Sequence, residues 1–86
     1  MDILFTPGHS PGHISLLNRE EKIIISGDVI FQGSIGRTDL PGGDFNVLIK
    51  SIKDKILCLH DETIIYSGHG QNTTIGKEKT SNPFIM

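Results

Sequence analysis

Thr6-Pro7-Gly8-His9-Ser10-Pro11-Gly12-His13 follows directly on the apolar run of residues 3–5. Short β-branched or aromatic runs bounded by Gly or Pro are typical of buried strands. A glycine just past a strand lets the backbone turn with a positive φ, so that the next side chain can point into a crevice. Residues 6–13 are therefore predicted to form a loop at a strand end, with His9 presented beyond the strand.

The same layout occurs twice more in the chain. Ile23-Ile24-Ile25-Ser26-Gly27-Asp28 and Ile64-Ile65-Tyr66-Ser67-Gly68-His69 each run from apolar residues through a small residue and a glycine to a side chain that can bind a metal. In open α/β sheets, ligands bind in the crevice beyond the carboxyl ends of the strands. Neutral imidazole and carboxylate suit zinc or non-haem iron, and one carboxylate can bridge two ions. If the three strands share a sheet, the pattern predicts a metal site formed by His9, Asp28 and His69.

Length and composition limit the class of protein. The 86 residues make at most one small domain with a thin core. The net charge of -2 argues against a nucleic-acid surface, which needs clustered Lys and Arg. The single cysteine, Cys58, excludes an intrachain disulfide and fits a reducing compartment. No apolar stretch approaches the ~20 residues that span a bilayer, so we expect a cytoplasmic protein with no membrane partner.

The remaining elements are predicted from periodicity, turns and caps. Gly and Pro are frequent in residues 32–43, which are expected to form a long irregular loop that is either functional or mobile. Asp44 is expected to cap an amphipathic helix over residues 44–57, because apolar residues recur there at three- and four-residue intervals. Cys58, near the end of that helix, is expected to be buried. The other predicted elements are a strand at 2–5, a hairpin of 13–17 and 22–27, a strand at 63–67, a turn at 70–74 and a short helix over 75–79 capped by Thr73 or Thr74.

Four motifs together carry a family resemblance. They are Thr-Pro-Gly-His-Ser-Pro-Gly-His at 6–13, Ser-Gly-Asp at 26–28, Gly-Arg-Thr-Asp at 36–39 and Ser-Gly-His-Gly at 67–70. In order and spacing they resemble the metallo-β-lactamase fold superfamily, specifically its small glyoxalase II-like hydrolases. The resemblance implies an α/β chain belonging to a four-layer αββα sandwich. Because the family's leading His-x-His-x-Asp-His motif is absent, residues 1–86 are expected to be a single partial domain. It would be the C-terminal half of the sandwich, a sheet with one long helix and a short C-terminal helix.

The resemblance also implies roles for the three strand-end residues. His9 would bind the first metal, Asp28 would bridge both metals and act in catalysis, and His69 would bind the second metal. The implied cofactor is one or two zinc ions, with iron or manganese also compatible. In the complete enzyme, metal-bound water would attack an acyl or thioester bond of a small-molecule substrate.

Three further residues are expected beside this site. His13 is predicted to be a neighbour and not a ligand, while Arg37 and Asp39 are predicted either to pair with each other or to bind substrate. The alternatives for the ligands are ordinary structural roles. His9 alone could be a loop histidine bonded to the backbone, and Asp28 alone could be a turn former after Gly27.

The missing motif leaves three hypotheses for function. This chain alone is expected to bind metal weakly and to have little hydrolase activity, with the missing N-terminal half or a second copy as its partner. Gly-Arg-Thr-Asp at 36–39 also resembles the iron-dependent persulfide dioxygenases, although Gly-His-Gly at 68–70 favours the hydrolases. The third hypothesis is a non-catalytic half-fold that serves association.

Overall fold

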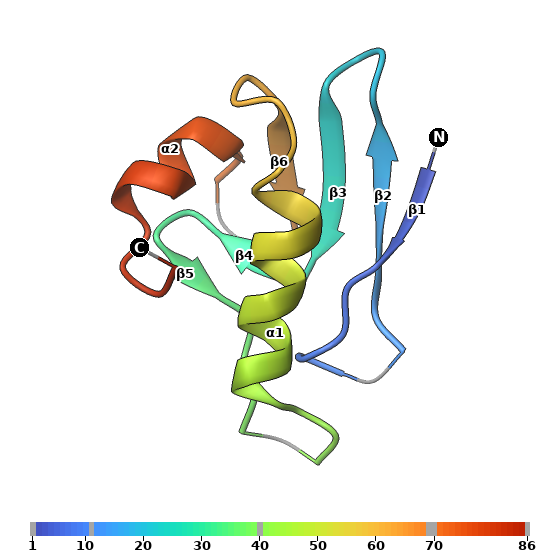
Figure 1. The fold of residues 1–86 in the computed structure, drawn as a ribbon, viewed down its shortest axis with the longest axis vertical. Coiled ribbons are helices and arrows are strands. Elements are labelled where there is room, and N and C mark those ends of the chain that lie inside the picture. Colours follow the sequence, from blue (N-terminus) through green and yellow to red (C-terminus); the bar gives the residue numbers. More distant parts are fainter. Residues whose placement is uncertain (1, 11, 40, 69–70, 86) are drawn as a thin grey trace.

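The computed structural model describes residues 2–10, 12–39, 41–68 and 71–85. In this part of the chain the main sheet has the strand order β1-β2-β3-β6-β7, and β4 and β5 form a separate hairpin (Figure 1). The elements are β1 Asp2–Phe5, β2 Ile14–Asn18, β3 Ile23–Gly27, β4 Ile30–Phe31, β5 Ser34–Ile35, helix α1 Phe45–Ser51, π-helix η1 Ile52–Ile56, β6 Ile64–Ser67, β7 Thr73–Thr74 and helix α2 Ile75–Ser81.

The strand directions bring three carboxyl ends to one edge of the sheet. β1 pairs antiparallel with β2, and β2 pairs antiparallel with β3, so β1 and β3 run the same way. β6 pairs parallel with β3. The three strands therefore share a sheet, as the predicted metal site requires, and β1, β3 and β6 all run downwards in Figure 1.

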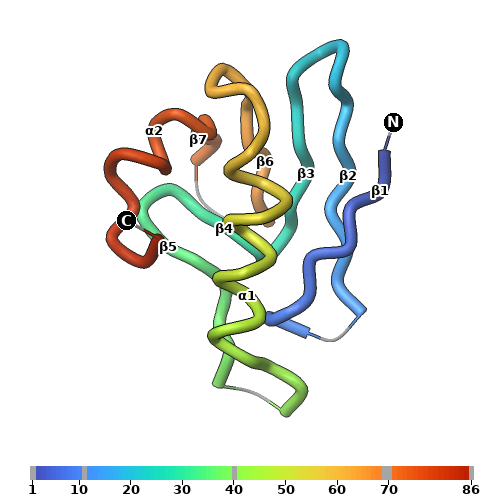
Figure 2. Tube along the Cα trace, in the orientation of Figure 1, coloured from blue at the N-terminus to red at the C-terminus, as the bar shows by residue number. Residues whose placement is uncertain are grey.

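The core lies between one face of the sheet and the long helix. Residues alternate along each strand, so Leu17, Ile24 and Ile65 are buried on the helix side. Figure 2 shows α1 and the segment after it crossing in front of β3 and β6. The helix contributes its buried apolar stripe, and the core as a whole consists of Leu17, Ile24, Val29, Ile30, Leu48, Ile52, Ile56, Leu59, Ile65, Ile75 and Ile85.

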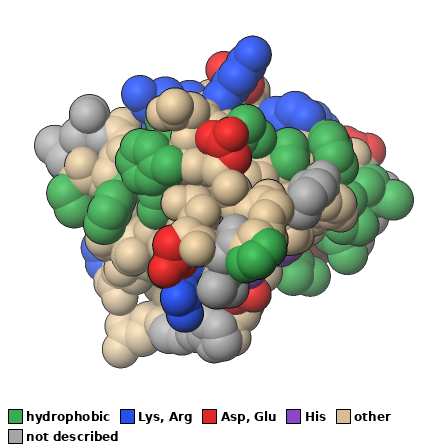
Figure 3. Space-filling model, turned by 90° about the horizontal axis from the view of Figure 1, so that it is seen from below, with side chains coloured by type: hydrophobic (Ala, Val, Ile, Leu, Met, Phe, Trp, Pro, Cys, Tyr) green, Lys and Arg blue, Asp and Glu red, His purple; other side chains and the backbone are tan. Residues whose placement is uncertain are grey.

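The opposite face of the sheet is apolar and exposed. Ile3, Phe5, Ile14, Ile25 and Tyr66 are 69%, 50%, 46%, 47% and 38% exposed. Strand pairing makes them neighbours, since Phe5 lies opposite Ile14 and Ile25 lies opposite Tyr66. Hydrophobic side chains gather on the right of Figure 3, the side on which β1 and β2 lie. We call these five residues the apolar sheet face.

The long helix begins where the sequence predicts. Asp44 is extended, and its side chain accepts a hydrogen bond of 3.1 Å from the Val47 amide, as an N-cap does. The second half differs from the expected regular helix because residues 52–56 form a π-helix, in which the Leu57 amide donates to the Ile52 carbonyl. Ile52 and Ile56 both remain buried.

The prediction of an irregular loop across residues 32–43 is wrong at its start. Ser34–Ile35 pair with Ile30–Phe31 as a short hairpin, and Gly33 occupies its turn with a φ of 73°. The Gly33 amide and the Ser34 carbonyl also bond to side chains of α2. These long-range contacts stabilise a hairpin that local composition does not predict.

The C-terminal segment agrees in part. Thr74 caps α2, accepting from the Lys77 amide at 3.2 Å, as predicted. Thr73–Thr74 pair with β6 where only a turn was expected. Cys58 is exposed, contrary to its predicted burial, because it lies in the turn after the helix and not on its buried stripe. None of the helices in the described residues has the length and apolar character required to cross a membrane.

Candidate metal centre

Two of the predicted ligands meet at the common edge of the sheet. His9 Nε2 lies 3.6 Å from Asp28 Oδ2, with side chains that are 24% and 41% exposed. Gly8 and Gly27 have φ values of 130° and 57°, so each backbone turns just before its ligand as predicted. The edge therefore presents an imidazole and a carboxylate that face each other.

The His9 ring is fixed by a backbone carbonyl. His9 Nδ1 lies 2.8 Å from the carbonyl oxygen of Arg37. Because that oxygen can only accept, we assign the proton to Nδ1, which leaves a lone pair on Nε2 in the neutral ring. Metal-binding histidines are commonly held in this way through their other nitrogen.

His9 Nε2 and the Asp28 carboxylate have the chemistry and the spacing of ligands to one metal ion. In the neutral tautomer, Nε2 cannot donate to Asp28, so two electron-pair donors face each other, and a cation between them, either a proton or a metal, would stabilise the arrangement. Two ligands of one tetrahedral zinc, with bonds of about 2.0–2.2 Å, lie about 3.4 Å apart. The observed separation of 3.6 Å is close to that value.

Two glycines crowd the carboxylate residue. A Cβ at Gly36 would lie 1.8 Å from the Asp28 carbonyl oxygen, and one at Gly68 would lie 3.0 Å from Asp28 Oδ1. The Gly68 amide also donates to the Gly27 carbonyl at 3.0 Å. Unlike Gly8 and Gly27, Gly68 does not have a positive φ. A glycine is favoured there because a side chain would come too close to the Asp28 carboxylate.

A cavity of about 230 Å³ opens beside the pair. Its polar side is His9 and Asp28, and its other walls come from the β4–β5 hairpin and the residues that follow it. The lining residues are His9, Asp28, Phe31, Ser34, Ile35, Gly36 and Arg37. The cavity can therefore hold a small molecule with one end on the candidate ligands and an apolar part against the hairpin.

His13 lies next to the pair, as predicted. Its ring centre is 6.2 Å from that of His9, with the planes at 87°. Thr6 Oγ1 lies 3.3 Å from His13 Nδ1 and 3.0 Å from Ser15 Oγ, so the ring is held from inside the sheet. Burial lowers the pKa of His13, the nearby His9 lowers it further, and the Asp28 charge opposes both. His13 is thus biased towards the neutral form.

We expect this bias to appear in an NMR titration of the His13 ring. The midpoint should lie below the ordinary value of 6.5. Asp28→Asn should lower it further, because a carboxylate that favours the charged ring is lost, and His9→Gln should raise it. Because the folded-state pKa lies below the unfolded value, His13 stabilises the fold above pH 6.5, and this contribution declines as the pH falls towards the folded value. A midpoint above 6.5 would contradict the assignment.

Arg37 and Asp39 form the predicted ion pair. Arg37 Nε and Nη2 each donate to one Asp39 carboxylate oxygen at 3.0 Å. The hydrogen bonds from Arg37 lower the pKa of Asp39. Both side chains are 67% exposed, and the pair braces the loop whose backbone carbonyl meets His9.

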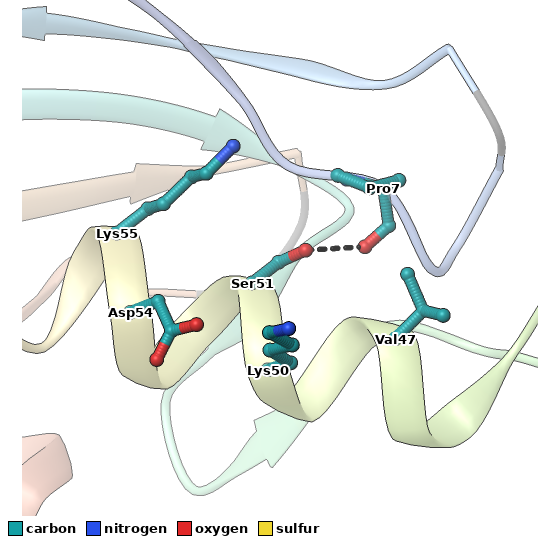
Figure 4. Close-up of a pocket in the computed structure, with 6 residues that line it drawn as sticks. All are labelled: Pro7, Val47, Lys50, Ser51, Asp54 and Lys55. Carbon is teal, nitrogen blue, oxygen red and sulfur yellow. Dashed lines mark hydrogen bonds between the residues drawn. The ribbon is translucent and has the colours of Figure 1, made fainter.

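The loop that carries His9 is anchored on the long helix. Ser51 Oγ donates to the Pro7 carbonyl at 2.8 Å, as Figure 4 shows. The Asp44 amide donates to the Gly8 carbonyl at 2.7 Å. A second hollow of about 210 Å³ lies along this contact, with Lys50 and Lys55 beside it. The residues before His9 are therefore held in place at two points by α1 and its cap.

His69, the third predicted ligand, lies outside the described residues. The strand before it, β6, ends beside Asp28 through the Gly68 contact. Across residues 2–10, 12–39, 41–68 and 71–85, no group of three or more His, Cys, Asp and Glu side chains surrounds one possible metal position. His9 and Asp28 are the pair that the described structure brings together.

The sequence did not identify several parts of this arrangement. The partner of His9 is the Arg37 backbone carbonyl, which leaves no trace in residue type. The roles of Gly36 and Gly68 as close contacts of Asp28 also require the fold, although both glycines stand in the quoted motifs. Thr6 stands at the start of the first motif, and its buried hydroxyl positions His13.

Comparison with known proteins gives consistent matches. The profile of the metallo-beta-lactamase superfamily matches residues 3–69. The chain is 57% identical, over 98% of its length, to hydroxyacylglutathione hydrolase GloC of Haemophilus influenzae. It is 49% identical, over 99% of its length, to the probable metallo-hydrolase YqgX of Bacillus subtilis.

Solved structures agree with the fold. BLEG-1 B3 metallo-beta-lactamase superposes with a TM-score of 0.96 at 54% identity, over 99% of this chain and 41% of that one. TTHA1623 in a di-iron-bound form has a TM-score of 0.93 at 47% identity, over 96% and 41%. ETHE1 from Myxococcus xanthus has a TM-score of 0.89 at 35% identity, over 95% and 37%. The chain spans about 40% of the length of the curated relatives named above.

Proposed function

The chain belongs to the metallo-beta-lactamase superfamily, and from this premise we propose that it is part of a metal-dependent hydrolase acting on acyl or thioester bonds. The observation that carries the proposal is the pairing of His9 Nε2 with Asp28 Oδ2 at 3.6 Å. The resemblance to a hydroxyacylglutathione hydrolase over 98% of the chain supports a glyoxalase II-like substrate class.

Each residue of the site has a defined task in this proposal. His9 and Asp28 would bind the metal, and His69 would complete the second metal position. The Arg37 carbonyl holds the His9 ring, while Gly36 and Gly68 leave room for the Asp28 backbone and carboxylate. When bound, the metal supplies a Lewis acid and lowers the pKa of water towards about 7. We propose zinc, with iron as the alternative.

The apolar part of the cavity would orient the substrate. Phe31 and Ile35 line this cavity together with the two ligands, so an acyl group would lie against them with its carbonyl towards His9 and Asp28. The identity of the acyl group would follow from the shape of this part of the cavity.

The apolar sheet face is where we place the partner. In the relatives, about 60% of the chain lies outside the part that matches, and sheets bury apolar faces by packing another sheet or helices against them. We propose that the equivalent of that remaining part covers Ile3, Ile14 and Ile25 and completes the metal ligands. Alone, this chain would bind metal weakly, because a catalytic zinc has three protein ligands.

The test is a chimera in which this chain replaces its matching part in the Haemophilus influenzae relative. We expect the chimera to retain metal after dialysis and to hydrolyse a hydroxyacylglutathione thioester. His9→Ala and Asp28→Ala should each reduce zinc affinity and kcat/KM by at least about 100-fold, more than the loss of a residue that only supports a ligand. His60→Ala is the matched control, since His60 is exposed and its ring accepts a hydrogen bond only from the nearby Glu62 amide among the described contacts.

Metal content and activity are measured on the same variants, so that loss of metal can be compared with loss of hydrolysis. Metal content by elemental analysis should fall together with activity in both site variants and stay unchanged in His60→Ala. A chimera that folds but neither holds metal nor depends on His9 and Asp28 would refute the proposal. The isolated chain should retain well below one equivalent of zinc.

A second candidate is an iron enzyme of the persulfide dioxygenase type. Gly-Arg-Thr-Asp at 36–39 and the similarity to ETHE1 at 35% identity favour it. The higher identity to GloC, 57%, favours the hydrolase. A chimera that holds a single iron and consumes oxygen with a persulfide substrate would favour the dioxygenase.

A third candidate is a non-catalytic association module, which the apolar sheet face favours. Sedimentation of the isolated chain at micromolar concentrations distinguishes it. Self-association that Ile25→Lys abolishes and Lys53→Glu does not would favour this role, because Ile25 lies on that face and Lys53 is exposed on the helix. A stable monomer would count against it.

A further inference from the structure

We infer that Glu78 and Asn82, at the end of the chain, are positioning residues for the His9 ring; the inference rests on the proposed metal-binding function. Glu78 and Asn82 are both fully buried. Neither touches the candidate ligands, and no sequence motif includes them. They act on the site through the β4–β5 hairpin.

The contacts run directly from α2 to the hairpin turn. Glu78 Oε1 accepts from the Gly33 amide at 2.9 Å, and Asn82 Nδ2 donates to the Ser34 carbonyl at 3.0 Å. Asn82 Nδ2 also donates to Glu78 Oε1 at 2.9 Å, and Thr73 Oγ1 donates to Glu78 Oε2 at 2.6 Å. The turn and the first residue of β5 are thus bonded to one buried pair.

The β4–β5 hairpin is stabilised by these contacts, and its position in turn determines the position of the Arg37 carbonyl. β4 and β5 share only two residue pairs, and an isolated two-stranded hairpin is marginally stable in water. Directly after β5, the Gly36 amide donates to the Val29 carbonyl at 3.0 Å, and the next residue, Arg37, presents the carbonyl that accepts from His9 Nδ1. A shift of the hairpin therefore moves the atom that selects the His9 tautomer.

The chemistry of Glu78 argues against simple packing. Burying a carboxylate is costly unless its oxygens accept hydrogen bonds, and an apolar residue of similar size would fill the space without that cost. Here the oxygens accept three bonds, one from the hairpin, one from Thr73 in β7 and one from Asn82, the C-cap of α2. Hydrogen bonds depend on direction, so they fix the position of the hairpin more closely than apolar contacts would.

The test uses long-range ¹⁵N–¹H NMR spectra of the His9 ring in the metal-free chain at about pH 8, where an ordinary imidazole is neutral. The wild type should show a single tautomer with the proton on Nδ1. Asn82→Ala and Glu78→Ala should shift the nitrogen signals towards an exchanging mixture. Glu78→Gln should preserve the wild-type spectrum, since an amide oxygen can still accept from Gly33 and Asn82. Zinc affinity of the chimera should fall about tenfold in Asn82→Ala.

Lys79→Ala is the matched control on the same helix. Lys79 Nζ bonds Asp61 at 2.7 Å on the exposed side, so its loss loosens α2 without touching the hairpin. A folded Asn82→Ala chain with an unchanged His9 spectrum would overturn the inference, even if Glu78→Ala does not fold. Because the ring spectrum is recorded without metal, it tests the positioning role separately. Absence of metal from the chimera would refute the proposed function instead.

Discussion

Gly8→Ala is expected to lower the free energy of unfolding by about 3–5 kcal/mol. Gly8 has a φ of 130°, which an L side chain rarely adopts, and an added Cβ would lie 2.3–2.4 Å from Leu48 backbone and side-chain atoms. Leu48 is fully buried and cannot move away without disturbing the core. For 86 residues the total stability is about 4–13 kcal/mol, so the variant should lose a large fraction of it. Urea denaturation followed by circular dichroism measures the loss.

Gly12→Ala in the same loop is the control. A Cβ there meets nothing within 4 Å, so the change in unfolding free energy should stay within about 0.5 kcal/mol. Equal stability of the two variants would show that the loop does not pack on α1 as described.

Gly36→Ala is expected to cost about 2–4 kcal/mol of stability and to weaken zinc binding by the chimera. Its Cβ would lie 1.8 Å from the Asp28 carbonyl oxygen and 3.4 Å from His9 Nδ1, so the backbone that carries the carboxylate must shift. A displaced Asp28 can no longer meet His9 Nε2 at the observed distance. Thermal unfolding gives the stability, and zinc titration by calorimetry gives the affinity.

Gly33→Ala is the control that separates the effect of backbone strain on stability from the effect of displacing Asp28 on zinc binding. Gly33 has a positive φ, 73°, and lies in the turn of the hairpin that precedes Gly36, but its Cβ would meet nothing within 4 Å. It should cost about 1–2 kcal/mol through backbone strain and leave zinc affinity unchanged, because its amide still bonds Glu78. If Gly36→Ala kept full zinc affinity, the close approach to Asp28 would have no role in the site.

Local signals predicted much of the fold. The caps Asp44 and Thr74 are where the sequence places them, because each bonds an amide three residues ahead. The shared direction of β1, β3 and β6 follows from two local hairpin pairings and one parallel pairing. The β4–β5 hairpin was missed because its support comes from Glu78 and Asn82, more than 40 residues further along the chain.

The sequence predicts which side chains form the candidate site, but not how they are oriented. The repeated strand-end layout correctly brings His9 and Asp28 to one edge, while His69 stays a prediction. The orientation of the His9 ring could not be predicted, because a backbone carbonyl sets it and every residue has one. The π-helix after α1 has no local signal either, since the apolar spacing there equally fits an α-helix.

The mixed pairing of the sheet implies an order of folding. β1, β2 and β3 are joined by short connections, so their pairing closes small loops and can form within microseconds. The parallel pairing of Ile23 with Ile64 must wait for the hairpin, the helix and the turns between them to become compact. His9 and Asp28 are thus expected to approach each other early, while the strand that leads to His69 joins last and sets the pace at which the edge is completed.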